Sequence, residues 1–277
     1  MVASLISSAV KYFVVFLLSL TILYNCSEKN NPDPDPPVLP PQSSMSLDLS
    51  GLKDDGGTNV PKTNMPEISA AMVLTNWQIA YSTVAFWTGV TTITMAVPIT
   101  AFGSTINSEP EYQGDLQWKW TRDFWSIYTA DLYGKINGSK VEWQMYISLA
   151  GKYNDYLWYS GESNIDGTGG TWIFNKSYEN PVNYLQVEWH RPDSTMADLR
   201  YEVVETGTED EGSFIFYTYN ANNIYDKTCS LFNAADTINM DVEWSGIDQS
   251  GRVRSSKYFS DDLWHCWDEN RNNTNCD

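Results

Sequence analysis

Histidine and basic side chains are scarce in this chain of 277 residues. There are two histidines, and 17 Lys and Arg residues stand against 35 Asp and Glu residues, for a formal net charge of −18. So few cations suit neither the phosphates of nucleic acids nor docking of the bare chain on an anionic membrane surface. We therefore expect no nucleic-acid partner, and we interpret the acidity as a well-solvated surface.

The chain also lacks the short motifs of common enzyme classes. It has no G-x-S-x-G elbow and no H-E-x-x-H, and the Gly-rich run at 167–170 is not followed by the helix that a phosphate site needs. His190 falls on the polar side of a strand, and Cys229 has no partner set for nucleophilic catalysis. We expect no enzymatic activity and no cofactor. A carboxylate pair stays open, because a sequence does not show the separation of two acids.

An apolar run and a proline-rich run mark the N-terminus. Lys11 precedes twelve mostly apolar residues at 12–23, a length that suits a signal peptide and is short for a bilayer span. Six of the twelve prolines lie from Pro32 to Pro41, so that segment is extended and unable to pack. A stiff polar spacer of this kind suits a tethered domain.

With Leu23 three residues before Cys26, this N-terminus resembles those of bacterial lipoproteins with a type II signal peptide. The resemblance implies that residues 1–25 are removed, that Cys26 carries a lipid, and that 26–44 form a tether. It also implies a membrane anchor in the outer membrane of a Gram-negative cell envelope. The two residues before the cysteine are larger than is usual in that family, so a plain secretory peptide and an uncleaved anchor remain as alternatives.

Residues 45–277 are expected to form a single β-rich domain, which resembles uncharacterised envelope lipoproteins. Its first part, Ile68 to Ser108, contains no charged residue, and Val73, Trp77 and Val84 recur at a helical spacing. We expect one or two apolar helices over 68–106, packed on the concave side of a sheet. A lid over a ligand cavity and a transmembrane hairpin are the alternatives.

From Asp115 to Phe259 the pattern is one of short strands. Apolar and polar residues alternate over 141–149 and over 185–190, and Asn137-Gly138 favours a hairpin turn. We expect a mainly β fold of about ten strands, joined as an antiparallel meander that forms a barrel or half-barrel. The tripeptide Val-Glu-Trp occurs three times. Each copy indicates a strand whose Val and Trp side chains face the core and whose Glu faces water. The alternative is that the three glutamates form a row of acids on one surface.

The C-terminal cysteines predict a disulfide. Cys266 and Cys276 lie ten residues apart in a loop rich in Asn, and outside the cytoplasm such a pair oxidises readily. Cys229 is then left without a partner, unless it displaces one of the two. A transition metal at His265 and the two cysteines, or calcium at the acids of 261–269, is possible chemistry, but we assign no metal site.

Three functions fit these features, and the first is a non-enzymatic structural or assembly role with an envelope protein partner. The second is carriage of an apolar ligand such as a lipid, in a layout similar to the lipid carriers of lipoprotein sorting. The third is carbohydrate binding, with sugar rings stacking on Trp118 and Trp120, which share one strand face, or on Tyr156 and Trp158. For both pairs the alternative is a place in the core.

Overall fold

The structure, a computed structural model, describes residues 33–48, 50–52, 74–194 and 196–276, without the side chains of 88–94. Residues 1–35 and Pro36–Asp277 are separate units, and the second contains the helices and strands given below. Cys26, the predicted signal peptide and the first part of the predicted helical segment lie outside the described residues.

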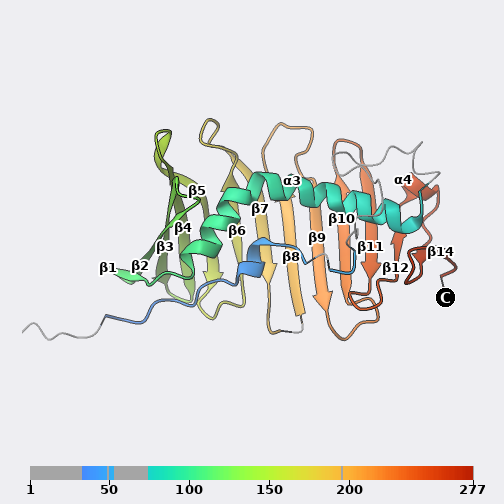
Figure 1. Cartoon of the computed structure of the whole chain (residues 1–277), viewed down its shortest axis with the longest axis horizontal. Coiled ribbons are helices and arrows are strands. Elements are labelled where there is room, and N and C mark those ends of the chain that lie inside the picture. The colour runs from blue at the N-terminus through green and yellow to red at the C-terminus, as the bar shows by residue number, and fades with distance from the viewer. Residues whose placement is uncertain (1–32, 49, 53–73, 195, 277) are drawn as a thin grey trace, which may run out of the picture. The chain divides into compact units, whose positions relative to one another are not determined.

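A single antiparallel sheet of 14 strands forms the body of this unit (Figure 1). Every strand pairs with the next one along the chain, so the predicted meander is confirmed. The strands are β1 Glu111–Gly114, β2 Gln117–Phe124, β3 Tyr128–Asn137, β4 Lys140–Leu149, β5 Tyr153–Asn164, β6 Gly169–Asn175, β7 Asn183–His190, β8 Met196–Val203, β9 Phe214–Asn220, β10 Lys227–Asn233, β11 Ile238–Trp244, β12 Gly251–Arg254, β13 His265–Trp267 and β14 Asn273–Thr274.

Two details of the predicted sheet are wrong. The sheet is open, because β1 and β14 are its two edges, so of the predicted barrel or half-barrel the closed barrel is wrong. It has fourteen strands instead of about ten, because β1, β12, β13 and β14 are two to four residues long. Strands this short are stabilised by their neighbours in the sheet and show almost no alternation in the sequence.

Tryptophan and glycine alternate on the inner face of the first strands. Cross-strand pairing places Trp118 opposite Gly134, Gly134 opposite Trp143, Trp143 opposite Gly161, and Gly161 opposite Trp172. A Cβ atom on either glycine would overlap an indole ring. The missing side chains therefore make room for the large rings, which fill the core that helix α3 covers.

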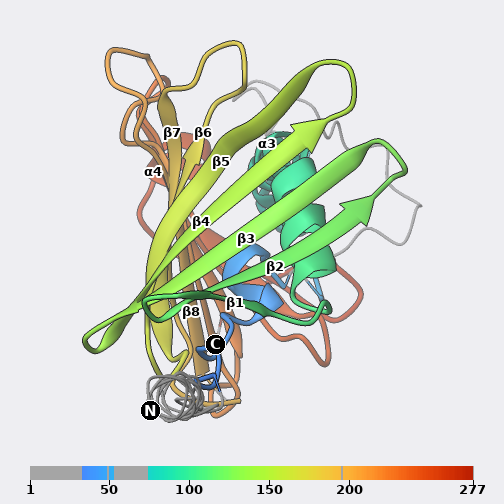
Figure 2. The same cartoon turned by 90° about the vertical axis from the view of Figure 1, so that its left-hand side faces the viewer.

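Helix α3, Asn76–Thr105, runs across the inner face of the sheet (Figures 1 and 2). It packs against β2 and β3 near one edge and against β12 and β13 near the other. Thr75 and Gln78 form a capping box at its start, and the helix continues through Pro98. Of the predicted one or two helices, the structure therefore has one long helix here.

A 3-10 helix, η1 Gln42–Met45, lies near β7 and α3, and a short helix, α4 Ser256–Phe259, contacts β11. Within the described part of the chain, no helix combines the length and apolar character needed to cross a membrane.

Candidate functional site

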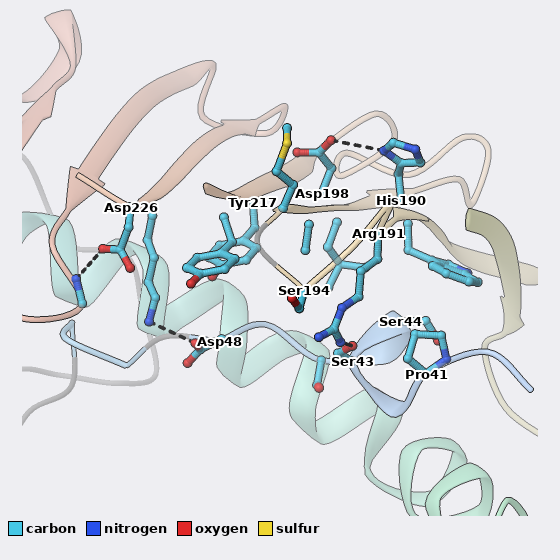
Figure 3. A pocket seen from close by; sticks show the side chains of 18 of the residues that line it. Pro41, Ser43, Ser44, Asp48, His190, Arg191, Ser194, Asp198, Tyr217 and Asp226 are labelled. Carbon is cyan, nitrogen blue, oxygen red and sulfur yellow. Dashed lines mark hydrogen bonds and ion pairs between the residues drawn. The ribbon is translucent and has the colours of Figure 1, made fainter. Parts of the chain in front are cut away.

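A cavity of about 440 Å³ lies between residues 41–48 and the ends of strands β7 to β11. We call residues 41–48 and 50–52 the strap; Figure 3 shows Pro41, Ser43, Ser44 and Asp48 of this segment beside the side chains that line the cavity. Trp189, Tyr217 and Tyr219 give the cavity aromatic walls. Its size is within the range of sites for small molecules.

The strap is fixed to the sheet at two places along its length. Near its start, the hydroxyl of Ser44 accepts a hydrogen bond of 3.2 Å from the indole nitrogen of Trp172. Near its end, the carbonyl oxygen of Ser50 accepts hydrogen bonds from the indole nitrogen of Trp244, at 3.0 Å, and from Lys227. The donors at both anchoring points are buried and cannot reach water. The oxygens of the strap supply the hydrogen bonds that these donors need.

Lys227 is the most unusual side chain of the site, because its β10 position faces the core and its side chain is only 4% exposed. Its ammonium group lies 3.0 Å from a carboxylate oxygen of Asp48 and also donates to the hydroxyl and carbonyl oxygens of Ser50. A buried lysine needs such partners, since removal of its charge from water is costly.

The carboxylate of Asp48 is stabilised in its charged form. Partial burial raises its pKa, but hydrogen bonds from the backbone of Ser50 and from Lys227 outweigh burial and hold the pKa below the usual 3.8. Burial also raises the pKa of Tyr217, so this phenol stays neutral at physiological pH. Lys227 and Asp48 form an ion pair, so their charges neutralise each other.

The remaining polar groups of the cavity lie around its rim (Figure 3). A ring nitrogen of His190 is 3.8 Å from a carboxylate oxygen of Asp198, and Arg191 donates a 2.9 Å hydrogen bond to Ser43. Asp226 accepts a hydrogen bond of 2.6 Å from the backbone nitrogen of Gly246, on the β11–β12 connection. The rim thus presents both donors and acceptors to whatever enters.

Trp189 brings an unused donor to this cavity. The residue is 5% exposed, and its indole nitrogen is buried with no hydrogen-bond partner among the described residues. A buried donor without an acceptor costs about 1–3 kcal/mol, so native proteins rarely keep one without a reason. Trp189 is also one of the residues that line the cavity.

The predicted stacking residues do not form an exposed platform. Trp118 and Trp120 are each 2% exposed on the inner face, so their prediction as ligand-stacking residues is wrong. Tyr156 and Trp158 are half-buried and in contact with each other, with centroids 5.5 Å apart. They belong to an aromatic cluster at the opposite ends of the strands, which also contains Tyr153 and Tyr178. The alternation of residues predicted that the two members of each pair lie on the same face of the sheet. It did not predict which face of the sheet other parts of the chain cover.

The cysteines are arranged as the sequence predicts. Cys266 and Cys276 form a disulfide with Cα atoms 5.3 Å apart, and Cys229 is a buried free thiol. Burial raises the pKa of Cys229 far above its usual value. Within the described ranges, no group of three or more His, Cys, Asp or Glu side chains is arranged to hold a metal ion.

Sequence reasoning missed the central residues of the cavity. Lys227 is separated from Asp48 by most of the chain, and this pairing leaves no local pattern. One signal was present: Lys227 occupies the inward register of Cys229 and Leu231, where a charged residue needs a partner. Trp189 was expected to face inward, but its missing hydrogen bond is visible only in three dimensions.

Comparison with protein-family models, with curated proteins and with solved structures found no match to this chain.

Proposed function

We propose that this chain is a non-enzymatic binding protein of the cell envelope, tethered by a lipid on Cys26, that holds a small neutral polar molecule in the strap cavity. One observation carries the proposal: Trp189, whose indole nitrogen is a buried donor without a partner among the described residues, is one of the residues that line the cavity. A hydroxyl or carbonyl oxygen of the ligand would accept this hydrogen bond.

The charges of the cavity favour a neutral ligand. Lys227 is already neutralised by Asp48, whereas Arg191 donates to the neutral hydroxyl of Ser43 and keeps its charge. Asp198 and Asp226 also line the cavity and outnumber this one guanidinium, so the lining does not favour an anion. The aromatic walls suit a ring with apolar faces, and the rim suits hydroxyl groups.

Several polar side chains of the cavity are engaged in structural contacts. The hydroxyls of Ser43 and Ser44 accept hydrogen bonds from Arg191 and Trp172, and the contact of His190 is with Asp198. A nucleophilic serine needs a base within hydrogen-bond reach. This arrangement supports binding without chemistry.

The proposed site is tested with the full-length chain and the substitution Trp189→Phe, which keeps an aromatic ring and removes the donor. Native mass spectrometry detects a copurified ligand, and thermal shifts with glucose, galactose, mannose and N-acetylglucosamine test one ligand class directly. We expect the substitution to weaken binding about two- to tenfold, the value of one hydrogen bond.

Trp77→Phe is the matched control, because Trp77 is equally buried with an unpaired indole nitrogen but lies outside the cavity. Equal binding by Trp189→Phe and Trp77→Phe would contradict the site. A bare protein mass together with no thermal shift from any sugar would contradict the proposed ligand class.

An assembly role is the second candidate, and exposed apolar side chains favour it. Trp125 and Ile127, on the β2–β3 connection, are 55% and 52% exposed. Tyr178, on the β6–β7 connection at the same ends of the strands, is 44% exposed and stacks on Tyr153. Exposed aromatic residues of this kind are typical of protein interfaces. Crosslinking from a photoreactive residue at Trp125 in cells, compared with one at Leu116, tests this role.

Carriage of a large apolar ligand has less support. Helix α3 packs on the inner face and buries Trp87, Met95 and Phe102 in the same core as the sheet. A lipid chain would compete with these side chains for the inner face, so binding would require displacement of α3.

A further inference from the structure

The outer face of strands β2 to β6 carries a second hollow, remote from the strap cavity in the fold. Two adjoining depressions, of about 440 and 360 Å³, share Gln117, Tyr133 and Gln144 as lining residues. Because they share these side chains, we treat them as one feature, the outer groove. Figure 2 looks onto these strands, with α3 on their far side.

The register of the sheet shows how the outer groove is built. Cross-strand pairing aligns Lys119, Tyr133, Gln144, Ser160 and Ile173 in one row, with one residue from each of five neighbouring strands. This row runs perpendicular to the strands, over about 19 Å at the usual strand spacing. The small Ser160 lies between longer side chains, which leaves the hollow open at its middle.

Two tyrosine rings give the groove an aromatic wall. Tyr133 and Tyr146 are half-buried, with centroids 5.7 Å apart and planes at 89°. The ammonium group of Lys119 lies 5.5 Å from the centre of the Tyr133 ring and 3.1 Å from Asp131. These contacts fix the orientation of the rings, so a ligand would not have to order them on binding.

Several polar groups of the groove have unused hydrogen-bonding capacity. The side chains of Gln117, Lys135 and Ser160 make no hydrogen bond or ion pair with another described residue. Charged groups of the groove are paired, as Lys119 is with Asp131 and Glu162 with Lys140. The groove thus offers the donors and acceptors of these three unpaired side chains beside ring faces.

We propose that the outer groove binds a linear neutral polysaccharide. The apolar faces of sugar rings would pack on Tyr133 and Tyr146, and their hydroxyls, which both donate and accept, would bond the amides of Gln117 and Gln144. Four carboxylates against two ammonium groups line the groove, so an anionic chain is repelled. The row across five strands matches an extended chain better than a single sugar.

Native affinity electrophoresis of the full-length chain tests this site. The protein is kept in a polyoxyethylene detergent, since sugar-based detergents would compete, and the gels contain dextran, mannan, xylan or laminarin. We expect retardation by at least one of these neutral polysaccharides and none by alginate, which is anionic. Tyr133→Ala should weaken the retarding interaction about tenfold, and Ser160→Tyr, which fills the hollow, should abolish it.

Phe216→Ala is the matched control, because Phe216 is an exposed aromatic residue on the outer face of β9, away from the groove. This variant and Trp189→Phe should be retarded like the wild type, which separates the groove from the strap cavity. Absence of retardation by all four neutral polysaccharides would overturn the proposal. So would retardation that neither Tyr133→Ala nor Ser160→Tyr reduces in variants shown to be folded by circular dichroism.

Discussion

The ion pair between Lys227 and Asp48 joins two parts of the chain that are 179 positions apart. Lys227 is buried on the sheet, while Asp48 is a largely exposed residue of the strap. The pair therefore links the position of the strap to the charge of one carboxylate. Because the carboxylate pKa is held below 3.8, the strap should respond to acid.

We predict that Asp48→Asn destabilises the protein at pH 7, and that this effect shrinks as the pH falls below the unfolded pKa of the carboxyl group. A carboxylate with a lowered folded pKa contributes stability above its unfolded pKa, about 3.9, and loses it as the pH falls through the folded value. The check is the urea midpoint of wild type and variant from pH 7 to pH 2.5. A difference between the two that stays constant over this range would rule out the linkage.

A second prediction concerns the inner-face glycines that lie opposite tryptophans in the sheet. In Gly161→Ala the new methyl group would overlap the Trp172 ring and the carbonyl oxygen of Thr171, and the backbone or ring must shift. We expect a loss of about 1–3 kcal/mol in the free energy of unfolding, measured by urea denaturation. The neighbouring outward substitution Ser160→Ala should change it by less than about 0.5 kcal/mol. Similar losses in both variants would show that the inner-face overlap is not the cause.

At the scale of elements, the end of the chain secures the start of α3. The side chain of Asn76 donates to the carbonyl oxygen of Cys266 on β13, and its backbone nitrogen donates to Asn273 on β14, both at 2.8 Å. The disulfide of Cys266 with Cys276 holds β14 close to β13. A two-residue strand thus acquires a role in orienting a 30-residue helix.

Removal of this disulfide, in the double substitution of Cys266 and Cys276 to serine, should lower the free energy of unfolding by about 2–3 kcal/mol. The same loss should follow from reduction of the wild-type protein, and dithiothreitol should have no effect on the variant. Urea denaturation with and without reductant measures both. Cys229 stays in place as a buried thiol, so a loss in the wild type alone is expected on reduction.

At the scale of the whole unit, α3 and the sheet share one core. The helix contacts β2 and β3 near one edge of the sheet and β12 and β13 near the other, so it bridges strands that do not pair directly. An open sheet of this length exposes its inner face unless something covers it. Helix and sheet are therefore expected to unfold together.

Hydrogen exchange followed by mass spectrometry checks this expectation. Amides of α3 near the buried Ala80 and Phe102 should exchange only through global unfolding, at the rate of amides in the central strands. Faster exchange throughout α3 would show that the helix leaves the sheet independently. That result would support the alternative function, in which the inner face of the sheet carries an apolar ligand.

Local patterns in the sequence were enough for the strands with one buried face and for the apolar helix. Alternation of side chains on β4 and β7 is a property of neighbouring residues, and the uncharged segment around Trp77 needed burial wherever it lay. The Cys266–Cys276 pair is close along the chain, so spacing alone indicated it.

Only the tertiary structure decided the rest, because it depends on residues that are far apart. Whether Trp118 faced solvent or α3 could not follow from its own strand, since a sheet has two faces and the sequence does not say which is covered. The strap cavity needs Asp48 beside Lys227, and the outer groove needs five strands in register. Composition and periodicity therefore determined the elements, whereas the long-range pairing of those elements determined both candidate sites.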